Sequence, residues 1–134
     1  MLSVMLIAFS ITALAQFALY YWRAILAGVA AQPVSERVFA AAGLHQNRVT
    51  SRDFDTLAGL HALTPELHPG QNSLGLVPVY YRLVEWIGAR AGQHFPAMAE
   101  WSERERTVCA LYTAVQVDRR LHENLALAAS LRSC

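Results

Sequence analysis

The first 22 residues of this 134-residue chain carry no charged side chain, and this uncharged run constrains the fold more than any other feature. Up to residue 19 the run is apolar apart from four isolated polar residues: Ser3, Ser10, Thr12 and Gln16. A helix of about 20 such residues is ~30 Å long, which matches the hydrocarbon core of a bilayer. The next residues suit the membrane–water interface, where aromatic rings and arginine collect: Tyr20, Tyr21, Trp22 and Arg23. We therefore predict a transmembrane anchor helix over residues 1–31.

A cleaved signal peptide is the alternative interpretation of this segment, because Val29, Ala30 and Ala31 resemble a small-residue cleavage site. Two features favour a retained anchor. No positively charged residue precedes the apolar run, and the run is longer than the hydrophobic region of a typical signal peptide. We expect a single-pass membrane protein.

The distribution of arginine predicts the orientation of the anchor. No basic residue precedes the span, whereas Arg23, Arg37 and Arg48 follow it. The positive-inside rule then places the N-terminus outside and the following domain in the cytoplasm. All 11 basic residues are arginine and alanine is abundant, as in proteins from GC-rich bacterial genomes. The expected location is therefore the bacterial inner (cytoplasmic) membrane.

Small and polar residues in the anchor predict that it packs against another membrane helix. Gln16 is a polar amide deep in the apolar run, and such a group is costly to leave in lipid. Two pairs of small residues lie four positions apart, the spacing that lets helices approach closely: Ala24 with Gly28, and Ala27 with Ala31.

Residues 32–134 predict a small helical domain at the membrane surface, so the fold class is all-α. Helical signals recur over about 33–42, 51–62, 76–91 and 97–132, and no hairpin dipeptide or strong alternating pattern is present. Thr50 and Asp53 form a loose capping box before the second of these helices. Ser102 and Glu105 match the same motif inside the last one, which predicts that the helix restarts there.

The last predicted helix is long for a domain of this size. About 30 residues would span ~45 Å, whereas a compact domain of about 100 residues is only ~34 Å across. Either the helix bends, or its end projects onto another molecule. The candidate partner surface consists of large apolar residues that need not all be covered by the domain: Trp86, Trp101, Leu127 and Leu131.

The sequence offers little catalytic or cofactor chemistry. There is no lysine, which excludes Schiff-base and P-loop lysine chemistry, and the net charge of +1 gives no basic footprint for nucleic acid. The two cysteines, Cys109 and Cys134, are too few for an iron–sulfur cluster and lack a haem-attachment motif. We expect Cys109 to be a buried small residue. We expect no catalytic residue, no cofactor and no metal site.

These patterns predict a cofactor-free accessory or structural subunit of a larger bacterial membrane complex, for example a respiratory or photosynthetic one. Its partners would be other subunits of that complex and the lipid bilayer. One alternative is a stand-alone, membrane-tethered binding or regulatory domain. The other is a small membrane enzyme, whose pocket would collect four titratable residues: Asp53, Asp55, His61 and His68.

Overall fold

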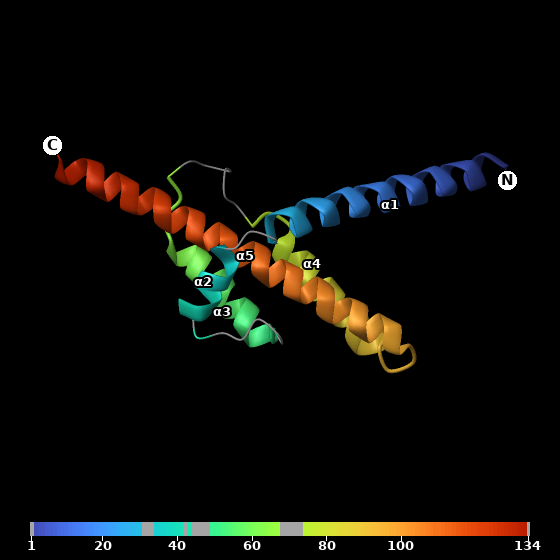
Figure 1. The fold of residues 1–134 in the computed structure, drawn as a ribbon. Helices are drawn as coiled ribbons and strands as arrows, with labels where there is room; N and C mark the ends of the chain where they lie inside the picture. The colour runs from blue at the N-terminus through green and yellow to red at the C-terminus, as the bar shows by residue number, and fades with distance from the viewer. Residues whose placement is uncertain (1, 31–33, 42, 44–48, 68–73, 134) are drawn as a thin grey trace.

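The computed structural model describes residues 2–30, 34–41, 43, 49–67 and 74–133 (Figure 1). Within these residues the chain forms helices and no strand, which confirms the all-α prediction. The helices, in chain order, are α1 (Leu2–Ala30), α2 (Val34–Ala41), α3 (Ser51–Leu63), α4 (Val77–Ala91) and α5 (Pro96–Arg132).

Local sequence signals set the helix ends. At the start of α3 the Thr50 hydroxyl accepts a hydrogen bond from the backbone N–H of Asp53, and the Asp53 carboxylate accepts one from the N–H of Thr50 at 2.8 Å. The predicted capping box is therefore formed, and it satisfies two backbone donors that a helix end leaves open. Gly43, just after α2, has φ +67°, a conformation that favours glycine.

The predicted restart at Ser102 is wrong, because α5 is one uninterrupted helix of 37 residues. The Ser102 hydroxyl donates within the helix, to the carbonyl oxygen of Ala99 at 2.9 Å, and its side chain is buried against Gly88 of α4. Glu105 points towards α1 instead of closing a capping box. At 1.5 Å per residue α5 is about 55 Å long.

Helix α5 is the central element, and α1, α2, α3 and α4 all contact it. Figure 1 shows α4 folded back along the first part of α5, while α2 and α3 lie beside its middle. The core between them includes a stacked aromatic pair, Phe54 and Tyr81, whose ring centroids are 3.9 Å apart. The other buried apolar residues of this core are Leu26, Phe39, Val49, Leu57, Val77, Cys109, Ala110 and Ala114.

Helix α1 has two parts with different surroundings. Its stretch from Ser3 to Val29 is long and apolar enough to cross a membrane, although a signal sequence would have the same character. The N-terminal part stands clear of the other helices in Figure 1. Near the other end, the Leu26 side chain is 1% exposed and Trp22 is partly buried against the core. The end of the apolar helix is thus part of the domain's packing.

Candidate functional site

An ion pair with a buried carboxylate joins α1 to the domain. The Arg23 guanidinium lies 2.5 Å from a carboxylate oxygen of Glu105, on α5. The Tyr80 hydroxyl, on α4, donates to the other carboxylate oxygen at 2.9 Å. The Glu105 side chain is only 7% exposed, whereas that of Arg23 is 49% exposed. Both carboxylate oxygens therefore have partners, as a buried charge requires. We call Arg23, Glu105 and Tyr80 the junction triad.

Two groups beside Glu105, the Tyr80 hydroxyl and the Cys109 thiol, stay neutral at physiological pH. Burial, the hydrogen bond to Glu105 and the nearby negative charge all raise the pKa of Tyr80 above its ordinary value. Burial, and to a lesser extent Glu105, raises the pKa of the Cys109 thiol to about 12. A protonated thiol of this kind is a poor nucleophile, because the thiolate is the reactive form. The junction triad is therefore suited to holding α1 in place.

Two grooves flank the junction triad and contain predicted anchor residues. In one, Ala24 and Ala27 face Arg104 and Val108 of α5. The other, about 270 Å³ in volume, separates α1 from α4 and has one wall formed by residues at the end of the apolar run: Gln16, Leu19, Tyr20 and Arg23. Its other wall comprises Tyr80, Leu83, Val84, Ile87 and Trp101.

Of the other two anchor residues predicted for helix packing, Gly28 does not line either groove. Gly28 has open space around the position of a side chain, and Ala31 lies outside the described residues. The contact of Gln16, Ala24, Ala27, Gly28 and Ala31 with another membrane helix stays a prediction. Tyr20 and Tyr21 are exposed on α1, as an interfacial position requires.

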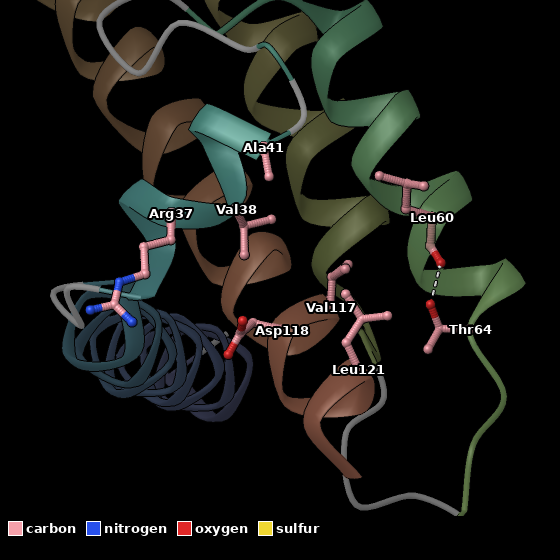
Figure 2. A pocket seen from close by; sticks show the side chains of 8 residues that line it. All are labelled: Arg37, Val38, Ala41, Leu60, Thr64, Val117, Asp118 and Leu121. Atoms are coloured by element: carbon pink, nitrogen blue, oxygen red, sulfur yellow. Dashed lines mark hydrogen bonds between the residues drawn. The ribbon is translucent and has the colours of Figure 1, made fainter. Parts of the chain in front are cut away.

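A third groove lies away from the junction triad, between α2, α3 and α5 (Figure 2). Its volume is about 350 Å³, and we call it the docking groove. Figure 2 shows Arg37 and Asp118 on one side and Leu60 and Thr64 on the other. Between them lies an apolar floor that consists of Val38, Val117 and Leu121. The eighth lining residue is Ala41.

A polar clamp holds the wall of the docking groove. The Arg120 guanidinium is buried, and one of its nitrogens donates to the carbonyl oxygens of His61 and Thr64, each at 3.2 Å. Its other terminal nitrogen lies 3.2 Å from the Glu66 carboxylate. A cation at this place complements the C-terminal end of α3, where carbonyl groups lack helical partners. The clamp fixes α3 against α5.

The docking groove continues onto the end of α5, which projects past the other helices in Figure 1. Leu121 lines the groove, and Leu125 follows four residues later on the same side of the helix. The large apolar side chains of this end are exposed: Leu121, Leu125, Leu127 and Leu131. Two of them, Leu127 and Leu131, belong to the predicted partner surface. Of the other two, Trp86 is exposed on α4 and Trp101 is partly buried.

The residues proposed for an enzyme pocket have separate structural surroundings. Asp53 closes the capping box, and the Asp55 carboxylate accepts hydrogen bonds from Arg82 at 2.7 and 3.0 Å. His61 is buried, and His68 lies outside the described residues. None of the three described residues lines the grooves above. In the described part of the chain, no three His, Cys, Asp or Glu residues gather closely enough to hold a metal ion.

Sequence reasoning missed the junction triad. It assigned Arg23 to the membrane interface and Glu105 to a capping box. One signal pointed elsewhere, since Glu105 lies four residues before Cys109 and therefore shares the buried face of α5. A carboxylate on an otherwise apolar helix face needs a cation or hydrogen-bond donors.

No known protein family, curated protein or solved structure matches this chain.

Proposed function

We propose that this protein is a cofactor-free accessory subunit of a larger bacterial membrane complex. Helix α1 anchors it in the cytoplasmic membrane, and the helical domain binds a neighbouring subunit. The observation that carries the proposal is the projecting end of α5, where exposed Leu125 follows the groove residue Leu121 on the same side of the helix and Leu127 and Leu131 add exposed apolar surface. Respiratory and photosynthetic complexes are hosts by analogy, since such assemblies contain small subunits without cofactors.

The docking groove indicates the chemistry of the partner. Its floor is apolar, and an arginine and an aspartate lie at one side. An amphipathic helix of another subunit fits such a groove, with apolar side chains on Val117 and Leu121 and polar ones beside Arg37 and Asp118. In Figure 1 this end of α5 points away from the N-terminus of α1, so the partner helix belongs to the membrane-distal part of the host.

The junction triad supports a structural role. Leu26 and the pair of Arg23 with Glu105 fix the end of the anchor to the domain, so the docking groove is held at a set place relative to the membrane. A subunit that bridges a membrane helix and a surface neighbour needs this geometry. A domain that searches for transient partners works better on a flexible tether.

The proposed orientation has the N-terminus outside and the domain in the cytoplasm. Leu63 is 82% exposed at the end of α3, which makes it a suitable place for a label. In a Leu63→Cys, Cys134→Ser chain, we expect a membrane-impermeant maleimide to react in inverted vesicles and not in intact spheroplasts. The reverse pattern would contradict this orientation.

The experiment that tests the function uses native membranes. They are solubilised mildly, intact complexes are separated by size, and mass spectrometry identifies what migrates with this chain. We expect co-migration with one large complex in a fixed ratio. The double variant Leu121→Glu, Leu125→Glu places charges on exposed positions of the α5 surface and should migrate alone, because a buried unpaired charge at an interface is costly.

The matched control is Leu63→Glu, which adds a charge to another exposed leucine outside the docking groove and should stay in the complex. Migration of the wild-type chain as a monomer or small oligomer would refute the accessory role and favour a stand-alone regulatory domain. Loss of a measurable reaction on replacing Asp55 and His61 by alanine, with assembly intact, would favour the enzyme instead.

A further inference from the structure

Helix α4 carries an apolar face that the domain does not use. Leu76, Val79, Leu83 and Trp86 follow the 3–4–3 spacing of one helix face, and each is at least half exposed. Phe95, in the turn after α4, is also exposed. The opposite side of α4 is buried in the core, and Arg82 and Glu85 occupy one flank. We call Leu76, Val79, Leu83 and Trp86 the α4 face.

The contacts that α4 makes with α3 and α5 show which way the α4 face points. Arg82 pairs with Asp55 of α3, and Glu85 accepts a hydrogen bond from Ser51 at the start of α3. The side of α4 towards α5 contains Val77, Tyr81 and Val84, which are fully buried. The α4 face therefore points away from both α3 and α5.

The groove beside the junction triad places α4 at a definite depth along the anchor. Leu83 and Ile87 line it opposite Gln16, Leu19 and Tyr20. If about 20 residues of α1 cross the hydrocarbon core, Leu19 and Tyr20 lie at its edge, and Gln16 lies about one helical turn inside it. Leu83 and Ile87 then lie at the same depth in the bilayer. Trp86 lies one helical turn after Leu83 on α4.

The direction of the α4–α5 hairpin agrees with this depth. In Figure 1, α1 and the hairpin leave the junction towards the same side of the molecule and diverge from each other, whereas α2, α3 and the end of α5 lie on the other side. The hairpin is therefore on the membrane side of the domain.

We propose that the α4 face lies in the headgroup layer of the same bilayer that α1 crosses, so that phospholipid covers it. This inference rests on the proposed anchor role of α1. The chemistry fits an interfacial helix, because tryptophan and phenylalanine favour that layer and Arg90, 5.7 Å from the Trp86 ring centre, can reach lipid phosphates.

The charged residues near the turn between α4 and α5 limit how deeply this hairpin enters the bilayer. Arg90 and Glu100 are exposed on either side of the turn, and such groups are costly in the hydrocarbon core. The hairpin therefore lies along the surface, and α1 is tilted in the bilayer to allow this. The domain has two anchoring elements, one spanning and one interfacial.

The test measures contact between Trp86 and lipid in the full-length protein. The Trp22→Phe, Trp101→Phe chain retains Trp86 as its single tryptophan. It is reconstituted in phosphatidylcholine–phosphatidylglycerol vesicles that contain phosphatidylcholine brominated near the top of its acyl chains. We expect Trp86 fluorescence to be quenched at least half as strongly as that of Trp22 in the matched Trp86→Phe, Trp101→Phe chain.

A chain with all three tryptophans changed to phenylalanine and Leu63→Trp provides a reporter outside the α4 face, and we expect no quenching there. Quenched Trp22 with unquenched Trp86 would overturn the inference and leave the anchor intact. The anchor itself is tested at Leu14, an exposed residue in the middle of α1: an unquenched reporter in a chain with all three tryptophans changed to phenylalanine and Leu14→Trp would refute it.

A nitroxide at Leu83→Cys, in a chain with Cys134→Ser, gives a second measurement that leaves the tryptophans unchanged. We expect higher accessibility to oxygen, which concentrates in lipid, than to a water-soluble nickel chelate. The same label at Leu63→Cys should show the opposite preference. Equal preferences at the two positions would contradict lipid contact at Leu83.

Discussion

At the scale of single residues, Glu105 determines how the anchor meets the domain. It is a buried carboxylate with one ionic partner and one hydrogen-bond donor, both on other helices. Removing one partner leaves the buried carboxylate partly unsatisfied. The stability lost in this way is larger than the difference in stability between the intact pair and a well-packed apolar replacement. The junction triad is thus a point where small changes have large effects.

We expect Glu105→Gln to lower the free energy of unfolding by about 1.5–3 kcal/mol, the range for a hydrogen bond to a charged group. We expect a loss at the lower end of this range, because Arg23 is half exposed and water weakens its attraction to Glu105. The control is Glu103→Gln, an exposed carboxylate on the same helix, which should stay within about 0.5 kcal/mol of wild type. Thermal unfolding in detergent measures both. A double-mutant cycle with Arg23→Gln that shows no coupling would contradict the ion pair.

Cys109 gives a prediction on pH. Its thiol pKa is raised from 9.0 to about 12, chiefly by burial, so folding favours the neutral thiol. A raised pKa contributes stability that is fully present below pH 9 and is lost as the pH rises towards 12. At pH 8 we expect iodoacetamide to leave Cys109 unmodified in the folded protein and to modify it in denaturant. Intact mass of a Cys134→Ser chain reads this directly, and rapid labelling without denaturant would contradict the burial.

At the scale of helices, close approach of α4 and α5 depends on Gly88. A side-chain carbon at this position would lie 2.2 Å from the hydroxyl oxygen and 2.7 Å from Cβ of Ser102. Both distances are far shorter than non-bonded contacts, so any larger residue must push the two helices apart. The hairpin that carries the α4 face is therefore held at a spacing that only glycine permits.

We expect Gly88→Ala to destabilise the fold by about 1–3 kcal/mol, as overpacking in a core does. Gly59→Ala is the matched control, since Gly59 is also inside a helix but has open space around it. That change should be neutral or stabilise by up to about 1 kcal/mol, because alanine is the better helix former. Denaturant unfolding compares the two. Equal midpoints would show that α4 and α5 are not in close contact at Gly88.

At the scale of the whole molecule, α1 is shared between membrane and domain. Cleavage after Ala31 would remove Leu26 from the core and Arg23 from Glu105. Filling a core position with a leucine contributes about 2–5 kcal/mol. A small domain with a limited core would lose a large part of its stability with this segment.

We therefore expect the protein extracted from native membranes to retain α1, and intact mass spectrometry checks this. A mass that corresponds to a chain starting after Ala31 would show that the apolar helix is a signal peptide. Leu26→Ala should then be without effect on the mature protein. If α1 is retained, Leu26→Ala should destabilise it by about 2–5 kcal/mol, and Ile25→Ala, at a 42% exposed neighbour, by much less.

The sequence by itself determined where the helices lie along the chain and how α3 begins. Apolar length, helical spacing and the capping box of Thr50 with Asp53 act over a few neighbouring residues, so they can be read along the chain. The tertiary structure alone decided which faces meet. Glu105 matched a local capping motif, yet its partners Arg23 and Tyr80 come from two other helices, because a buried carboxylate is stabilised by charge and hydrogen bonds more than by a local pattern. The docking groove and the α4 face depend likewise on which helices cover which sides of α5 and α4, and only the packing of the whole chain sets that.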